Sequence, residues 1–209
     1  MKYIFIFFYS FVLFGCSSGL DITLPDKYTE ENDQPKGYLV GMIGASRTLP
    51  ASGEALTTTL MIRQIGDDDT IMLTNDNSHS DFKTPSLLGQ LFILPLPAGE
   101  YELYRITIEG SNGNQTFNTN STGNLALKFR ITEDTANYIG EFIAISRVVK
   151  SQLWNLKYPS GRGYFKHGYD VERDSALFYQ LNPDLKAVNF QTKELAVIRN
   201  RLIYSDQSQ

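Results

Sequence analysis

Side chains that perform acid, base or nucleophilic chemistry are few or scattered in this sequence. The two histidines, His79 and His167, lie far apart in the chain, and we expect both at the surface or in turns. No serine lies in a Gly-x-Ser-x-Gly motif, and no glycine-rich phosphate loop follows a strand-like run. Asp and Glu side chains could still pair in space, but their spacing favours no particular pair. The sequence therefore predicts no catalytic residue, no metal ligand and no cofactor.

One stretch, residues 150–169, combines basic side chains with aromatic rings and contains no acidic residue. Rings beside cations can stack on sugars, and the cations can hold phosphate, carboxylate or anionic lipid headgroups. The candidate contacts to a ligand or headgroup are Trp154, Lys157, Tyr158, Arg162, Tyr164 and Lys166. Within the stretch, Pro159-Ser160-Gly161 has the residue types of a turn, which predicts a hairpin centred there.

A purely structural interpretation of residues 150–169 is favoured by the tendency of large apolar side chains to be buried. In this interpretation Leu153, Trp154, Leu156 and Phe165 belong to the core, and the neighbouring cations only flank them. The stretch is then an ordinary hairpin with one solvated face.

Two loops are rich in oxygen ligands, which calcium prefers. They are 67–69, a run of three aspartates, and 75–81, which includes Asn75, Asp76 and Asp81. Neither has the spaced acidic residues and final glutamate of an EF-hand. We therefore expect solvated hairpin turns, with a calcium site as the less favoured alternative.

The N-terminus has the anatomy of a secretory signal. After the cationic Met1-Lys2, residues 3–14 are aromatic or aliphatic except for Ser10. This run is too short to span a bilayer, which takes about 20 residues. The residues that follow this run favour a more specific kind of signal. The alternatives are an ordinary secretory signal and a buried apolar strand.

The apolar run ends in Leu13-Phe14-Gly15-Cys16, which resembles the lipobox of bacterial lipoproteins. The resemblance implies removal of residues 1–15 as a signal peptide, and a diacylglycerol and a fatty acid such as palmitate on Cys16, the single cysteine. Several acyl chains on one residue anchor a protein stably. Ser17 after the cysteine implies the outer membrane, with the protein on its periplasmic side.

Residues 16–36 are polar and show no sustained periodicity, which indicates a flexible tether with a span of roughly 25 Å. The alternative is that a part of it, Leu20 to Leu24, pairs as an edge strand. Residues 37–209 are then a single domain, with a hairpin and a helix from about residue 150.

Short apolar, β-branched and aromatic runs recur through that domain, separated by turn residues, which predicts an antiparallel β-sandwich. The expected strands are 37–47, 57–65, 70–74, 88–96, 100–109, 125–132, 138–149, 152–158 and 163–170. One helix is expected over 172–181, before Pro183, whereas 194–204 fits either a strand or a helix.

Two runs carry finer information about side-chain orientation. Residues 125–132 alternate cleanly, with Leu125, Leu127, Phe129 and Ile131 predicted to face the core. In 101–109 the apolar phase shifts midway, which indicates a β-bulge near Tyr104.

The segment from Leu94 to Tyr101, which contains Pro97 and Gly99, resembles a strand start in bacterial lipoproteins with a transthyretin-like (prealbumin-like) β-sandwich. Residues 138–142, and Arg173-Asp174 followed by Asn182-Pro183-Asp184-Leu185, are similar to later elements of such proteins. The resemblance implies an Ig-like or transthyretin-like architecture and an envelope location, but no activity. Pro97 and Gly99 are expected to make a tight corner on which Tyr101 packs.

Charge excludes one class of partner. Without residues 1–15 the chain has 18 basic and 23 acidic side chains, since that segment holds one of the 19 basic residues and no acid. A nucleic-acid binder needs a dense cationic face, so we expect no nucleic-acid partner. The sequence predicts a lipid-anchored, periplasm-facing binding or scaffolding protein without enzymatic activity, whose partner is an envelope protein or glycan. The alternatives are a carbohydrate-binding module and, less favoured, a hydrolase with a dispersed carboxylate site.

Overall fold

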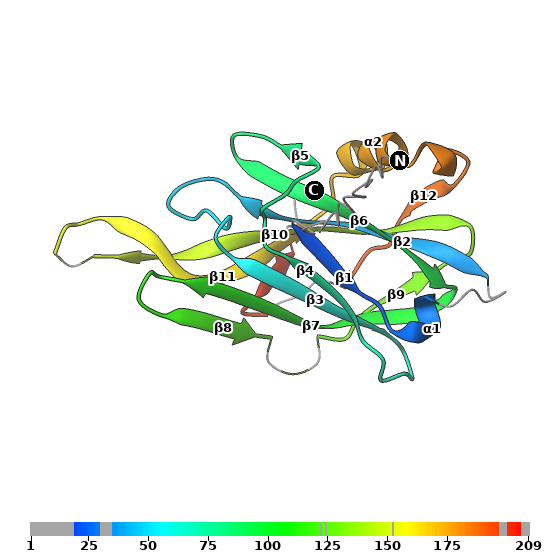
Figure 1. Cartoon of the computed structure of the whole chain (residues 1–209), viewed down its shortest axis with the longest axis horizontal. Coiled ribbons are helices and arrows are strands. Elements are labelled where there is room, and N and C mark those ends of the chain that lie inside the picture. The colour runs from blue at the N-terminus through cyan, green and yellow to red at the C-terminus, as the bar shows by residue number, and fades with distance from the viewer. Residues whose placement is uncertain are drawn as a thin grey trace, which may run out of the picture.

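The computed structural model describes residues 19–29, 35–121, 123, 125–151, 153–196 and 200–205. Within these residues, the strands form two β-sheets that face each other as a sandwich, and helix α2 (Val171–Leu181) packs on the outer face of one of them (Figure 1). The expected mainly β fold, a β-sandwich with a short helix near the C-terminus, is confirmed.

The first sheet is antiparallel over its described length. Its strands, in spatial order, are β1 (Leu20–Thr23), β4 (Ile71–Asn75), β3 (Thr57–Gln64), β7 (Gly99–Ser111) and β8 (Thr116–Asn120). Strand β9 (Leu127–Ile131) pairs with the first half of β7, while β8 pairs with its second half. The length of β7 therefore lets it carry two partners along one edge.

The second sheet contains both antiparallel and parallel pairs. Its strands, in spatial order, are β13 (Ile203–Ser205), β11 (Lys157–Gly168), β10 (Thr135–Lys150), β2 (Lys36–Ser46), β6 (Leu87–Pro97) and β5 (Phe82–Lys83), with β12 (Asn189–Thr192) beside the start of β10. β10 runs parallel to β2 and to β12, and β11 runs parallel to β13. The sandwich is therefore mixed rather than wholly antiparallel, because the chain crosses through the first sheet between β2 and β10.

The strand phase expected for residues 125–132 is confirmed. Leu127, Phe129 and Ile131 are buried, whereas Lys128 and Arg130 between them are exposed. The buried side chains join a core that fills the space between the two sheets.

The bulge expected near Tyr104 is also present. In the pairing of β3 with β7, Met61 lies opposite Arg105 and Ile62 lies opposite Leu103, so Tyr104 is the extra residue. Residues three apart face opposite sides of a regular strand. Because one residue is inserted here, Leu103 and Ile106 both point into the core.

Tyr101 closes the corner between β6 and β7. Its side chain is fully buried, and its hydroxyl donates a hydrogen bond to the carbonyl oxygen of Pro97 at 3.0 Å. The ring also stacks on Phe129 of β9, with the centroids 6.1 Å apart. The tight corner expected from Pro97 and Gly99 is therefore held by the buried Tyr101 and has a structural role.

The segment that we expected to be a tether is structured where it is described. Leu20 of β1 pairs with Asn75 of β4, and a short helix, α1 (Asp26–Thr29), follows. Leu20 and Leu24 pack against the core, which explains why the chain adds a strand to the edge of β4. Residues 20–29 are therefore not a tether, and the alternative of an edge strand within 20–24 describes β1.

The C-terminal third holds the remaining differences from expectation. Helix α2 begins after Asp170, whose carboxylate accepts a hydrogen bond from the backbone N–H of Arg173, and a 3-10 turn, η1 (Pro183–Leu185), follows it. Residues 194–204 are largely irregular where they are described, and only β13 is a strand. The short strands β5, β8 and β12 were not expected, because each is too short or too polar to show a strand period.

Candidate ligand-binding site

The strands β10 and β11 form a long hairpin that extends beyond the body of the sandwich (Figure 1). Its turn is at residues 151–156, where the backbone N–H of Ser151 donates to the carbonyl oxygen of Leu156 at 2.8 Å. The strand expected over 152–158 is therefore wrong for residues 153–156, which form the turn. The turn expected at Pro159-Ser160-Gly161 is also wrong, because these residues lie within β11.

Residues 159–161 instead make an irregularity in the β10–β11 pairing. Ser146 lies opposite Gly163, but Val148 lies opposite Pro159, so the ladder is interrupted around Gly161. Proline lacks a backbone donor and Gly161 has a φ of +76°, which are properties of bulges as well as of turns. A Cβ on Gly161 would lie 2.8 Å from the ring of Phe117, so only glycine lets β11 approach the β7–β8 turn of the other sheet so closely.

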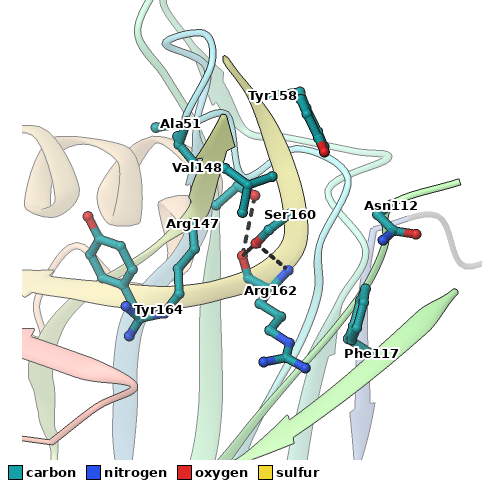
Figure 2. Close-up of a pocket in the computed structure, with 11 residues that line it drawn as sticks. Ala51, Asn112, Phe117, Arg147, Val148, Tyr158, Ser160, Arg162 and Tyr164 are labelled. Carbon is teal, nitrogen blue, oxygen red and sulfur yellow. Dashed lines mark hydrogen bonds between the residues drawn. The ribbon is translucent and has the colours of Figure 1, made fainter. Parts of the chain in front are cut away.

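A groove of about 750 Å³ lies where the hairpin meets the β7–β8 turn (Figure 2). Its size is in the range of small-molecule sites. The side chains that give it chemical character come from both sheets and are Asn112, Phe117, Arg147, Tyr158, Arg162 and Tyr164. None of its described lining residues is acidic.

The two arginines of the groove are held by aromatic rings and not by carboxylates. The guanidinium carbon of Arg162 lies 4.7 Å from the ring centroid of Phe117, and that of Arg147 lies 5.4 Å from the ring centroid of Tyr164. Arg147 also donates to the carbonyl oxygen of Arg201 at 2.7 Å. In the part of the chain that the structure describes, neither arginine forms an ion pair.

Two smaller hollows of about 420 Å³ each continue the groove on either side. One is lined by Lys150 and Lys157 together with Pro50, and the other by Arg147, Arg162 and Arg201. The described residues of these hollows also include no acid. The whole surface is therefore cationic, although the chain as a whole is net negative.

The candidate residues from the sequence occupy four different places. Tyr158, Arg162 and Tyr164 line the groove, and Lys157 lines the adjacent hollow. Trp154 lies in the turn of the hairpin, and Lys166 is exposed further along β11, outside the groove lining.

Arg147, Phe117 and Arg201 complete this surface but were not among the candidates. Arg147 falls in an expected strand, and the exposed side of that strand could have indicated it. Phe117 and Arg201 come from segments far away in the sequence, and no sequence signal placed them beside the hairpin.

The burial expected by the structural interpretation is wrong for the hairpin turn. Leu153, Trp154 and Leu156 have exposed fractions of 87%, 75% and 65%. Phe165 alone of that group is buried, because it lies on the part of β11 that covers the core.

A second charged cluster fastens α2 to the second sheet. Arg173 forms ion pairs with Glu141, Asp170 and the fully buried Asp174. Asp174 in turn accepts a hydrogen bond from the hydroxyl of Tyr138 at 2.5 Å. Burial and the neighbouring carboxylate raise the pKa of Tyr138 far above its usual value, so its hydroxyl stays a donor. The cluster joins residues 138–142 to Arg173-Asp174, two segments in which the sequence resembles transthyretin-like lipoproteins. Its carboxylates already form ion pairs with Arg173.

The two histidines have different environments. His79 is exposed, as expected, but His167 is buried and its Nε2 lies 2.9 Å from the carbonyl oxygen of Ile139. The expectation of a surface position is wrong for His167, because β11 turns this side chain towards Phe142 in the sheet. Burial lowers the pKa of His167, although the hydrogen bond opposes this shift.

The acidic loops also bind groups of the protein itself. Asp67 and Asp69 form ion pairs with Lys27, and Asp81 accepts a hydrogen bond from the backbone N–H of Leu91 at 2.8 Å. Among the described residues, no group of three or more His, Cys, Asp or Glu side chains is placed to hold a metal ion.

The proposed lipidation site, Cys16, and the signal peptide at residues 1–15 lie outside the described residues. In the ranges that the structure does describe, no helix is both long enough and apolar enough to cross a membrane. The chain matches no family model, no curated protein and no solved structure in comparisons with known proteins.

Proposed function

We propose that the protein is a lipid-anchored binding protein of the bacterial envelope, and that the groove at the base of the β10–β11 hairpin holds an anionic ligand. The observation that carries the ligand site is the pair Arg147 and Arg162, whose guanidinium groups lie over aromatic rings and have no carboxylate partner among the described residues. Planar guanidinium groups bind phosphate or carboxylate in a bidentate manner. No anion of the described protein satisfies them, so an external anion is the natural partner.

An anionic envelope glycan is the candidate ligand that the aromatic lining favours. Tyr158 and Tyr164 offer rings for sugar stacking beside the two arginines. Tyr164 meets Tyr204 of the adjacent hollow edge-on at 84°, so these two rings do not form a flat platform. This arrangement favours recognition of the charge over recognition of a neutral sugar chain.

We do not propose a hydrolase, because the two groups of converging acids reported above are bound to basic side chains. Arg173 binds Glu141, Asp170 and Asp174. Lys27 binds Asp67 and Asp69. The resemblance to transthyretin-like lipoproteins stays a prediction and is compatible with a non-enzymatic role.

Binding of acidic and neutral oligosaccharides of equal length tests the ligand site. The probes are oligogalacturonate and its uncharged galactose counterpart, titrated into the chain without residues 1–15 and with Cys16→Ser, which retains every described residue. We expect measurable affinity for the acidic probe only, weakened by added salt because the site is at the surface. Replacing Arg162 with Gln is expected to weaken binding about tenfold, the value of one charge-assisted hydrogen bond.

The matched control for that experiment is Lys166→Gln. Lys166 is a basic residue of the same strand outside the groove lining, so its loss is expected to change the affinity less than about twofold. Equal weakening by both substitutions, or equal binding of the neutral probe, would remove the groove as the ligand site.

The lipid anchor rests on the sequence of residues 1–16 and has a separate test. Mass spectrometry of the membrane-extracted protein is expected to find acylated Cys16 as the first residue. A soluble protein that starts at another residue would contradict the anchor. Cys16→Ser is expected to release the protein from membranes with an unchanged fold, because β1 starts four residues further on.

A further inference from the structure

The tip of the β10–β11 hairpin, residues 151–156, exposes large apolar side chains to solvent. The exposed fractions of Leu153, Trp154 and Leu156 are 87%, 75% and 65%. Such a group at the end of a projecting hairpin contributes nothing to the core, so its exposure needs another explanation.

The described residues of the hairpin tip, 151 and 153–156, form a hydrogen-bonded turn. The hydroxyl oxygen of Ser151 lies 3.3 Å from the backbone nitrogens of both Leu153 and Trp154, from which it accepts hydrogen bonds. The backbone N–H of Ser151 donates to Leu156, and Asn155 has the left-handed φ of +53°. Because several backbone groups of the tip are bonded within the tip, moving it into a less polar medium costs less.

Basic residues flank the hairpin tip. Lys150 and Lys157 lie directly opposite each other in the β10–β11 ladder, immediately behind the tip, and residues 150–169 contain no acid. Apolar side chains with Trp at the end and cations behind them match the depth profile of a bilayer surface, where acyl chains lie below anionic headgroups.

The proposed lipid anchor precedes the start of β1, which is the end of that strand nearer the hairpin. The carbonyl oxygen of Gly19, next to β1, accepts a hydrogen bond from the backbone N–H of Asp76 at 3.2 Å, which fixes Gly19 beside the end of β4. Cys16 is three residues before Gly19, which limits the distance between their Cα atoms to about 11 Å.

The strand pairing shows which end this is. Leu20 pairs with Asn75, and Asn75 also pairs with Thr58 at the start of β3. The adjacent Leu56 contacts Gly163, near the base of the hairpin. In Figure 1 the yellow hairpin projects to the left, and the blue β1 runs from the middle of the molecule towards α1 on the right, so the start of β1 is its end nearer the hairpin.

We propose that the hairpin tip inserts into the surface of the same bilayer that holds the lipid on Cys16, so that the domain contacts the membrane at two points. This inference rests on the anchor of the proposed function, since the anchor brings this end of the sandwich to the membrane. The groove, at the base of the same hairpin, is then held close to the headgroups.

Trp154 is the single tryptophan of the chain and reports on the tip directly. The test uses the chain without residues 1–15 and with Cys16→Ser, mixed with vesicles of phosphatidylcholine alone or with added phosphatidylglycerol. We expect the emission of Trp154 to shift to shorter wavelength and to become protected from a soluble quencher. Adding the anionic lipid is expected to strengthen partitioning about fivefold for each of the two lysines.

Leu153→Asp combined with Leu156→Asp is expected to weaken partitioning at least about tenfold, because apolar burial is lost. The matched control is Ile65→Asp, which changes an apolar side chain of 41% exposure at the opposite end of the first sheet and is expected to have no effect. The urea midpoint of each variant is also measured. A midpoint equal to that of the unchanged protein shows that the variant is folded and that only insertion is lost.

Unchanged Trp154 emission with both kinds of vesicle, or equal losses in the tip variant and the control, would overturn the proposal. A blue shift that depends on protein concentration in the absence of vesicles would do the same, since it would assign the tip to a second copy of the chain. Failure of the groove is read separately, because Arg162→Gln is expected to weaken binding of the acidic oligosaccharide about tenfold while leaving the Trp154 shift intact. Failure of the anchor is detected separately by mass spectrometry, as an N-terminus whose mass differs from that of acylated Cys16.

Discussion

Replacing Phe129 with Ala tests the packing of β9 and the first half of β7 on the core. Phe129 is 5% exposed and lies directly opposite Tyr101 in the β7–β9 ladder, with the rings stacked at 6.1 Å. Removing a buried phenylalanine lowers the free energy of unfolding by about 3–5 kcal/mol. Of this, about 0.5–1.5 kcal/mol comes from the ring pair, and the rest comes from lost burial and the cavity that remains.

The assay is urea denaturation followed by far-ultraviolet circular dichroism, because the exposed Trp154 reports poorly on the core. With a slope of about 2–3 kcal/mol per molar urea, the midpoint is expected to fall by about 1–2 M. Lys128→Ala changes the neighbouring exposed residue of the same strand and is expected to stay within about 0.5 kcal/mol of the unchanged protein. Similar midpoints for the two variants would refute the strand phase and the burial on which it depends.

Two further predictions concern the groove and pH. Gly161→Ala is expected to lower stability by about 1–3 kcal/mol and to weaken binding of the acidic oligosaccharide, because φ is +76° and the new Cβ meets Phe117; urea denaturation and titration measure both effects. The pKa of His167 is lowered below 6.5 in the folded protein, so protons bind the unfolded chain first and stability falls as the pH drops below 6.5, by up to about 1.4 kcal/mol per pH unit. The urea midpoint is expected to depend less on pH in His167→Gln than in the unchanged protein, and to keep its pH dependence in His79→Gln. The reverse pattern would contradict the burial of His167.

Much of the sandwich could be predicted because its strands carry a clear period. The alternation in 125–132 identified Leu127, Phe129 and Ile131 as core residues, and the phase shift in 101–109 located the bulge at Tyr104. In both cases one face is buried, so a shift by one residue would expose the whole apolar set.

The tether and the hairpin turn were mispredicted for related reasons. The run from Leu20 to Leu24 is short and surrounded by polar residues, so its pairing depends on the free edge of β4, which the sequence does not show. Pro159 and Gly161 suit a turn and a bulge equally, and the long-range approach of β11 to Phe117 selects the bulge.

The candidate site could be predicted in part. The combination of cations and rings in residues 150–169 identified Tyr158, Arg162 and Tyr164, which do lie together in the groove. Arg147 comes from β10 of the same hairpin, whereas Asn112 and Phe117 come from the other sheet and Arg201 of the adjacent hollow comes from the segment after α2, and only the fold brings these segments to the hairpin.

The most direct test of the central claim is the side-chain Nε–H nuclear magnetic resonance signal of each arginine during titration with oligogalacturonate. The account predicts that the signals of Arg147 and Arg162 shift together and saturate at one ligand concentration. Arg130, which is exposed and paired with Glu100 on the other sheet, serves as the internal control and is expected to stay unchanged. Shifts of all arginines in parallel, or of Arg130 without Arg147 and Arg162, would contradict a specific anion site in the groove.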